Sequence, residues 1–432
     1  MHRHSLAIVL LALSSAAQAA PAEDIGHWDG VMVAHGAALP VAFDFSAGAK
    51  ESLAGRFTSL GQAAMDYPLD SVRDDGKGIS FVLGGGITFT GARQGDAIAG
   101  HFTSEDVSGT FRLHRAPLPA LPYATEDVSF RNGAVTLKGT LCLPRGAGRH
   151  PAVILLHGSG PETRWGTSRY IADRFARAGI AALIFDKRGS GESGGDWRSV
   201  GFDDLARDAL AGVAMLAARP EIDPARIGLH GHSQGGAITP LAATLAPGKI
   251  AFLIAEDSFA GTQHDQDLYR VGNAIDELHL APDEKARAMH VYTLFVDAAR
   301  GAVPMAAFEK AAAPYRKTKW YDWMGIPPDD SWIWPWARKT GNFDTLPLWR
   351  QVHAPVLLVY GEKDALVPVD SSIAEIGAAL DTAHTPYAAL IVPGAQHNLT
   401  IQPEPGNHFF WWHQAPGLID TVVAWAAMQT RR

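Results

Sequence analysis

The feature that most constrains this chain is the stretch Arg226–Gly236, where an apolar strand pattern runs into Gly231-His232-Ser233-Gln234-Gly235 and then into a helical pattern. A serine on so tight a strand-to-helix turn adopts strained backbone geometry, and the flanking glycines let strand and helix approach without a Cβ clash. The turn exposes the Ser233 hydroxyl and places the Gln234 N–H at a helix N-terminus, where it can stabilise developing negative charge. For these five residues alone, an ordinary glycine-rich turn remains the alternative.

A second glycine-rich turn follows the continuous apolar stretch Pro151–Leu156, which is typical of a strand buried on both faces. The turn reads His157-Gly158-Ser159-Gly160-Pro161. Loops that leave the carboxyl ends of parallel strands are where open α/β sheets bind ligands, and their N–H groups suit an oxyanion. We therefore assign a second oxyanion donor to the backbone of Ser159, with Gly160 as the alternative.

Strand and helix patterns alternate along this part of the chain. This alternation predicts a doubly wound, mostly parallel sheet with helices on both faces. The expected strands are residues 180–185, 227–230, 250–255, 355–360 and 388–392, and the expected helices are residues 170–178, 204–218 and 236–245.

Three motifs in this order, His157-Gly-Ser-Gly, Asp186-Lys-Arg-Gly-Ser-Gly-Glu-Ser-Gly and Gly231-His-Ser-Gln-Gly, resemble the α/β-hydrolase superfamily. Within it, the chain is most similar to bacterial esterases related to dienelactone hydrolases and acylaminoacyl/dipeptidyl peptidases. In that family a strand followed by G-x-x-D-x-x-V-P carries the triad acid, which the resemblance places at Asp364. The loop Pro393–Asn398 matches the family's histidine loop and implies His397 as the base.

The order Ser233, Asp364, His397 is the one expected on this fold. A serine hydroxyl is a poor nucleophile unless a histidine takes its proton, and the acid holds that imidazole in the correct tautomer. Other residues compete for these two roles. The rival acids are Asp257 and Glu362, and the rival bases are His157, His232, His408 and His413.

The N-terminal region, residues 24–116, shows short alternating strands separated by glycine-rich turns, which predicts a small antiparallel sandwich or barrel. Its sequence shows no motif that combines a nucleophile with a base. Ala116-Pro-Leu-Pro-Ala-Leu-Pro122 then forms a semi-rigid connector. We expect the α/β-hydrolase domain to occupy residues 124–432.

The strand and helix rhythm breaks at residues 260–348, where helical spacing is joined by a concentration of tryptophans. This pattern predicts a helical cap inserted into the α/β domain. Trp320, Trp323 and Trp334 are candidates for lining a substrate pocket, because aromatic side chains commonly line such sites. Packing of the cap onto the core is the equally weighted alternative.

The first 19 residues combine a positively charged start, the apolar run Leu6–Leu13 and a site of the A-x-A type ending at Ala19. This arrangement predicts a signal peptide and export to the periplasm or beyond the cell. No later stretch is long and apolar enough to predict a membrane span. The single cysteine, Cys142, cannot form an internal disulfide and lies in an apolar alternating stretch that disfavours catalysis.

The net charge of −8 and the lack of a basic run disfavour nucleic acid as a partner. Neither a cofactor motif nor a metal-binding spacing is present, so we expect neither. The resulting hypothesis is a serine esterase acting on a small-molecule ester. A peptidase of the aminopeptidase or acylaminoacyl-peptidase type is the first alternative. A glycan- or lipid-binding protein that uses the N-terminal domain is the second. The oligomeric state stays open.

Overall fold

The computed structural model describes residues 24–48, 52–76, 78–328, 330–401 and 413–431. The predicted signal peptide lies outside these residues and stays a prediction. The chain divides into two compact units. The first contains the described residues up to Phe57 together with Pro68–Leu118, and the second contains Thr58–Tyr67 and the chain from Pro119 onward.

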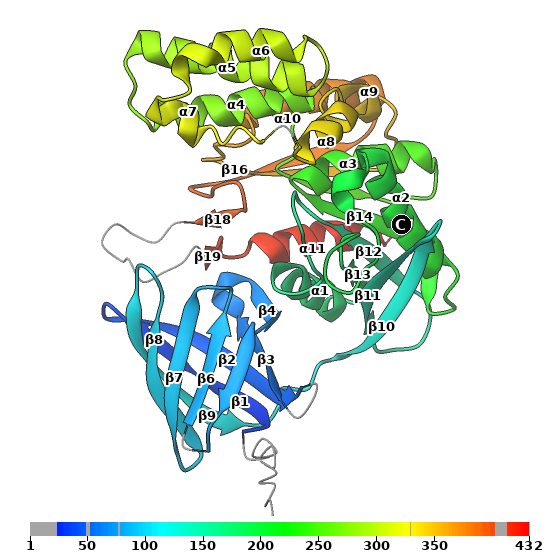
Figure 1. Cartoon of the computed structure of the whole chain (residues 1–432). Coiled ribbons are helices and arrows are strands. Elements are labelled where there is room, and N and C mark those ends of the chain that lie inside the picture. The colour runs from blue at the N-terminus through cyan, green and yellow to red at the C-terminus, as the bar shows by residue number, and fades with distance from the viewer. Residues whose placement is uncertain (1–23, 49–51, 77, 329, 402–412, 432) are drawn as a thin grey trace, which may run out of the picture. The chain divides into compact units, whose positions relative to one another are not determined.

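The first unit is an antiparallel sheet that closes on itself (Figure 1). The strand order is β2-β1-β9-β8-β7-β6-β5-β3, and a further pairing of β2 with β3 completes a ring of eight strands. Closure leaves the ring without free sheet edges. The strands of the ring are β1 (Gly26–Ala34), β2 (Ala37–Ala47), β3 (Leu53–Ser59), β5 (Ser71–Asp74), β6 (Gly78–Leu83), β7 (Ile87–Gln94), β8 (Ala97–Thr103) and β9 (Ser108–Ala116). The strand β4 (Ala64–Pro68) belongs, apart from Pro68, to the second unit.

Phenylalanine rings fill the interior of this barrel. Phe81 packs on Phe89 with ring centroids 4.5 Å apart, and Phe43 lies 4.9 Å from Phe81. Gly91 makes room for this packing, since a Cβ there would lie 2.7 Å from the ring of Phe111. The period-2 alternation that predicted a small antiparallel β domain therefore reflects one face of each strand pointing into a shared aromatic core.

The second unit contains an eight-stranded sheet in the order β10-β11-β13-β12-β14-β15-β16-β17. The pairs β10–β11 and β11–β13 are antiparallel, and the strands from β13 to β17 in this order are parallel. The predicted doubly wound, mostly parallel sheet is confirmed. Its strands are β10 (Tyr123–Asn132), β11 (Val135–Pro144), β12 (His150–Leu156), β13 (Ala181–Phe185), β14 (Ile222–His232), β15 (Leu253–Glu256), β16 (Val356–Gly361) and β17 (Tyr387–Val392).

Helices cover both faces of this sheet. α1 (Thr167–Arg177) and α11 (Leu418–Gln429) share one apolar core, in which Phe175 and Val422 are fully buried. On the other face, α2 (Phe202–Ala217), α3 (Gln234–Leu245) and α10 (Val369–Thr382) pack in a second core. Burial on both faces explains why β12, β13 and β16 are continuous apolar runs.

The chain changes direction across the sheet at β12. From β12 it passes to β13 on one side, whereas β14 lies on the other side of β12. Leu156 and Gly231 are register partners at the carboxyl ends of β12 and β14. The two glycine-rich turns that follow these strands therefore meet at a topological switch point, which is where such sheets bind ligands.

The predicted helical insertion is present between β15 and β16, and we call residues 260–348 the cap. It has an apolar core of its own, including Val291, Phe308 and Trp320. Two side chains of its first helix reach the loop after β16: Gln266 donates to the Leu366 carbonyl at 2.8 Å, and Asn273 donates to the Ala365 carbonyl at 2.9 Å. The cap helices are α4 (Gln263–Asp276), α5 (Pro282–Ala299), α6 (Met305–Ala312), α7 (Lys319–Trp323), α8 (Ile333–Thr340) and α9 (Leu346–Trp349).

Buried ion pairs hold the loop after β13. The Arg188 guanidinium donates two hydrogen bonds of 2.6 Å to the Asp208 carboxylate on α2, and both side chains are buried. Arg164 donates to Asp186 at 3.1 Å and also binds Glu192. Both arginines at this edge of the sheet are therefore engaged in ion pairs.

We expect Arg188→Met to lower the free energy of unfolding by about 3–5 kcal/mol, because it leaves the Asp208 carboxylate buried without its cation. Urea unfolding of the whole chain, followed by tryptophan fluorescence, measures this loss. Arg198→Met is the matched control, since Arg198 pairs with Asp196 at the exposed surface, and its unfolding midpoint should not change. Equal midpoints for the two variants would contradict the structural role of the buried pair.

Candidate active site

Ser233 lies between β14 and α3 in a backbone conformation that non-glycine residues rarely adopt. Its φ is 54° and its ψ is −116°. Strain of this kind costs about 1–3 kcal/mol and persists only where the surroundings impose it. Here the Ser233 N–H donates to the Glu256 carbonyl at 2.8 Å, which ties the turn to the end of β15.

Two glycines allow this turn to form. A Cβ on Gly231 would lie 2.3 Å from the Gly235 carbonyl oxygen, and a Cβ on Gly235 would lie 2.5 Å from the Leu156 carbonyl oxygen. Both distances are far inside van der Waals contact. The close approach of strand and helix expected from the sequence is therefore present on both sides of Ser233.

The structure brings Ser233, His397 and Asp364 together. His397 Nε2 lies 2.9 Å from Ser233 Oγ, and His397 Nδ1 lies 2.8 Å from Asp364 Oδ2. The other carboxylate oxygen of Asp364 accepts the N–H groups of Leu366 and Val367 at 2.7 Å and 3.0 Å. Because these backbone bonds orient the carboxylate, Oδ2 remains aimed at the imidazole.

The two rival acids occupy different positions. Glu362 accepts the Gly394 N–H at 2.7 Å at the exposed surface. Asp257 is fully buried beside Asp364, and its Oδ1 accepts the Gly361 N–H at 3.1 Å. Burial, followed by the neighbouring charge of Asp364, raises the pKa of Asp257 well above its usual value. Asp257 is thus a buried neighbour of the acid that contacts His397, and its charged form is disfavoured.

The rival histidines are also accounted for where the structure describes them. His157 donates to the Phe185 carbonyl, and burial together with the nearby Lys187 charge lowers its pKa to about 3. His232 contacts the His397 carbonyl at 3.3 Å through Nε2. His413 lies in β19 (His413–Gln414), and His408 falls outside the described residues.

A buried pair beneath the turn has no clear sequence signal. His230 Nε2 lies 2.9 Å from Glu256 Oε1, and both side chains are almost fully buried. Burial raises the pKa of Glu256, but the hydrogen-bonded His230 outweighs it and holds that pKa below the usual value. Glu256 therefore supports the site through two contacts. Its side chain binds His230 on β14, and its backbone carbonyl accepts the Ser233 N–H.

The two predicted oxyanion donors lie on the adjacent turns. Gln234 is the first residue of α3, and Ser159 follows β12 in the loop with Gly160, whose φ is 88°. Within the described part of the chain, neither the Ser159 N–H nor the Gln234 N–H has a hydrogen-bond acceptor. The first N–H groups of a helix have no partner in the helix itself, so the Gln234 donor is free to bind an anion.

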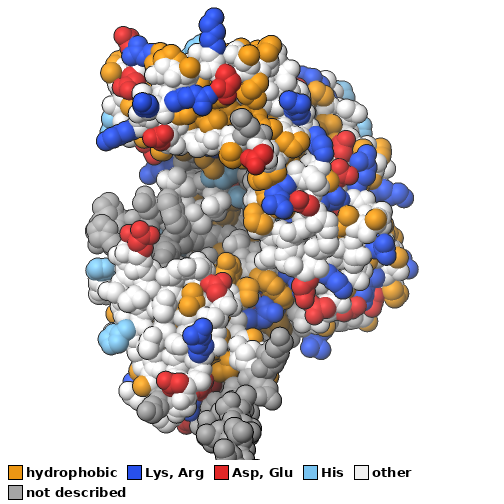
Figure 2. Space-filling view, in the orientation of Figure 1, with side chains coloured by type: hydrophobic (Ala, Val, Ile, Leu, Met, Phe, Trp, Pro, Cys, Tyr) orange, Lys and Arg blue, Asp and Glu red, His pale blue; other side chains and the backbone are white. Residues whose placement is uncertain are grey.

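The three candidate pocket tryptophans occupy different environments in the cap. Trp320 is 2% exposed within the cap core, whereas Trp323 is 44% exposed. Trp334 donates its indole N–H to the Pro328 carbonyl at 2.8 Å and contacts the Phe295 ring. Figure 2 shows hydrophobic side chains among Lys and Arg over the cap at the top of the view. A role in a pocket stays a prediction for all three.

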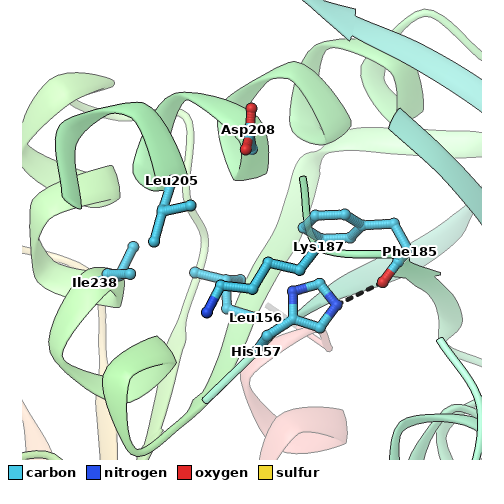
Figure 3. Close-up of a pocket in the computed structure, with 7 residues that line it drawn as sticks. All are labelled: Leu156, His157, Phe185, Lys187, Leu205, Asp208 and Ile238. Atoms are coloured by element: carbon cyan, nitrogen blue, oxygen red, sulfur yellow. Dashed lines mark hydrogen bonds between the residues drawn. The ribbon is translucent and has the colours of Figure 1, made fainter. Parts of the chain in front are cut away.

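A small cavity of about 20 Å³ lies behind the turn after β12 (Figure 3). Such a volume holds about one water molecule, so the cavity is too small for an ester substrate. Its charged side chains are Lys187 and Asp208, and the latter is paired with Arg188. The full lining is Leu156, His157, Phe185, Lys187, Leu205, Asp208 and Ile238.

Within the ranges that the structure describes, one group of side chains has ligand atoms close enough for a metal. Atoms of Asp257, Asp364 and His397 lie within 4.8 Å of one another. Asp364 and His397 already bind each other, as described above, so this grouping follows from the acid and base geometry. Cys142 is fully buried, and burial raises the pKa of its thiol to about 11. Among the residues described, no helix is both long and apolar enough to cross a membrane.

Part of the chain is similar to known proteins. The chain is 32% identical over 129 residues to the esterase EstD of Thermotoga maritima, a match that covers 28% of this chain and 31% of that protein. It is 33% identical over 120 residues to the thiohydrolase aneE of Aspergillus aculeatus, covering 28% and 36%. Each match thus spans about a third of the relative's length.

Among solved structures, the fold is similar to Est1E from Butyrivibrio proteoclasticus, with a TM-score of 0.45 and 16% identity over 71% of this chain and 99% of that one. The model of the alpha/beta hydrolase family matches residues 153–406, which is more than half of the 432 residues. The chain belongs to the alpha/beta hydrolase family.

Proposed function

We propose that this protein is a serine hydrolase that cleaves carboxylic esters through an acyl-enzyme. The observation that carries the proposal is the continuous hydrogen-bonded line from Ser233 Oγ through the two ring nitrogens of His397 to Asp364 Oδ2. Membership of the alpha/beta hydrolase family and the partial match to an esterase support it.

Acylation begins when Ser233 Oγ attacks the ester carbonyl carbon and His397 Nε2 takes the hydroxyl proton. The imidazolium that forms is stabilised by Asp364, which accepts the Nδ1 hydrogen. Serine reacts because this transfer avoids a free alkoxide. The distance of 2.9 Å between Oγ and Nε2 is within the range required of a nucleophile and its base.

The carbonyl oxygen becomes an oxyanion as the new C–O bond forms. The N–H groups of Gln234 and Ser159 would bind it, because both lack an acceptor within the described residues and lie on adjoining turns. Donors placed in advance stabilise charge that exists only near the transition state. They therefore raise kcat more than they strengthen substrate binding.

Collapse of this intermediate breaks the bond to the leaving alcohol, which receives the proton from His397. Water then attacks the acyl-enzyme carbonyl, and His397 accepts the proton from that water. A second collapse returns the proton to Ser233 Oγ and releases the carboxylic acid. The cycle consumes one ester and one water and leaves the protein unchanged.

Thioesters form a second candidate substrate class, favoured by the match to a thiohydrolase. The same steps apply, with a thiol in place of the alcohol as leaving group. The peptidase alternative requires protonation of a poorer leaving amine. Relative turnover of a matched ester, thioester and aminoacyl arylamide distinguishes the three classes.

We expect Ser233→Ala to lower kcat/KM for short p-nitrophenyl esters by at least about 10³-fold, because it removes the nucleophile. The thermal unfolding midpoint of the variant should equal or exceed that of the wild type, because a hydroxyl no longer has to be held beside His397. Ser129→Ala, on the exposed side of β10, is the control and should retain full activity. Hydrolysis by Ser233→Ala at the wild-type rate would overturn the proposal.

Gly235→Ala should lower kcat/KM by about 10²-fold or more and reduce the free energy of unfolding by about 1–3 kcal/mol. The added methyl group meets the Leu156 carbonyl, so the helix and the serine it presents must shift. Ester hydrolysis and urea unfolding measure the two effects. Gly272→Ala in α4 is the control, because its Cβ would meet only the end of Met289 at 3.9 Å. A fully active Gly235→Ala protein would contradict the role of close packing.

A further inference from the structure

Lys187 is a buried cation that no step of the proposed reaction uses. It stands in the loop after β13, and its side chain is 3% exposed. Its ammonium donates to the Gly158 carbonyl at 2.7 Å and to the Gln234 side-chain Oε1 at 2.8 Å. Burying an ammonium costs free energy unless it is paired and hydrogen-bonded, so this placement needs a compensating function.

The two acceptors belong to the two turns that carry the proposed oxyanion donors. The Gly158 C=O and the Ser159 N–H are opposite ends of one planar peptide group. A cation that binds the carbonyl oxygen fixes the plane of that peptide and draws electron density from its nitrogen. Hydrogen bonds in series polarise one another in this way, which makes the Ser159 N–H a stronger donor.

Lys187 holds the second turn through the side chain of Gln234, the residue whose own N–H is the other donor. Gly158 is also held on its amide side, where its N–H donates to Glu162 Oε2 at 3.2 Å. Glu162 therefore holds the His157–Gly158 peptide, and Lys187 holds the next one, Gly158–Ser159. Figure 3 shows the Lys187 and His157 side chains lining the same small cavity behind this turn.

We propose that Lys187 is a positioning residue for the oxyanion hole, which orients and polarises the Gly158–Ser159 peptide and joins it to Gln234. This inference rests on the proposed serine hydrolase function. Lys187 acts through the two backbone donors, and its positive charge adds a favourable field at the oxyanion.

The charged and aromatic groups around Lys187 set its protonation. Burial lowers the pKa of its ammonium to about 8, and the charge of Glu162 opposes this shift. The Trp197 ring lies 5.3 Å from Nζ. His157 is neutral near pH 7, and Asp208 on α2 is neutralised by Arg188.

The sign of the pH effect follows from these groups. Below about pH 8 Lys187 is protonated and both turns are held by a cation. As pH rises through 8 the ammonium loses its proton, the peptide is no longer polarised by a charge, and kcat should fall. The wild type should therefore show an alkaline limb in kcat with an apparent pKa of about 8.

The experiment compares wild type, Lys187→Met and Lys249→Met on a short p-nitrophenyl ester from pH 6 to 9.5. Lys249 is an exposed lysine after α3, so its variant is the control for loss of one positive charge. We expect Lys187→Met to lower kcat about 10- to 10²-fold at pH 7, with KM changed less than about threefold and the alkaline limb abolished. Lys249→Met should keep the wild-type rate and limb.

Two results would overturn the inference. One is a Lys187→Met protein with kcat within twofold of wild type and the same alkaline limb. The other, which needs no variant and therefore stands even if Lys187→Met fails to fold, is a wild-type kcat that stays flat from pH 7 to 9.5. In either case, the activity of Ser233→Ala is compared with that of the wild type. If the wild type hydrolyses the ester and Ser233→Ala does not, the proposed function stands and only the role of Lys187 fails.

Discussion

The strained turn at Ser233 is the constraint on which the rest of the site depends. A serine with φ of 54° can be held only if strand and helix approach within the space left by Gly231 and Gly235, and if its N–H is tied to the neighbouring strand. A sheet buried on both faces is then needed to keep the backbone of this strand–turn–helix unit from relaxing to an unstrained conformation. The core beneath α2 and α3 supplies that resistance, because a close-packed interior transmits strain without yielding.

Protonation states around the turn are set by burial and by local pairing. Burial beside Asp364 raises the pKa of Asp257 well above its usual value, and burial beside Lys187 lowers the pKa of His157 to about 3. In both groups the shift disfavours the charged form, and each lies next to a residue that has a role in the proposed reaction. Burial thereby disfavours like charges beside Asp364 and Lys187, the residues that contact His397 and the oxyanion turn.

Much of this architecture could be predicted from the sequence. Continuous apolar runs predict the parallel strands, and period-2 alternation predicts the antiparallel β domain. The order of the motifs predicts that Ser233, Asp364 and His397 lie on three loops at one edge of the sheet. The strands β4 and β5 could not be predicted in this way. β4 contains Asp66 with a φ of 55°, and β5 has only four residues, so neither carries an alternating pattern long enough to recognise.

The positions of Lys187, Glu256 and Asp257 could not be predicted in the same way, because their partners come from strands far away in sequence. Lys187 reaches Gly158 and Gln234 only after β13, β12 and β14 are placed side by side. The surroundings of the cap tryptophans depend likewise on tertiary packing. Trp320 and Trp323 are three residues apart on α7, yet one is buried and the other is exposed.

The most direct test of the central claim is to treat the active protein with an alkyl fluorophosphonate and locate the adduct by peptide mass spectrometry. The reagent forms a stable bond with a serine only where a base activates its hydroxyl. The account predicts one adduct, on the peptide that contains Ser233, formed in step with the loss of ester hydrolysis. Loss of activity with the adduct on another residue, or full activity without labelling, would contradict it.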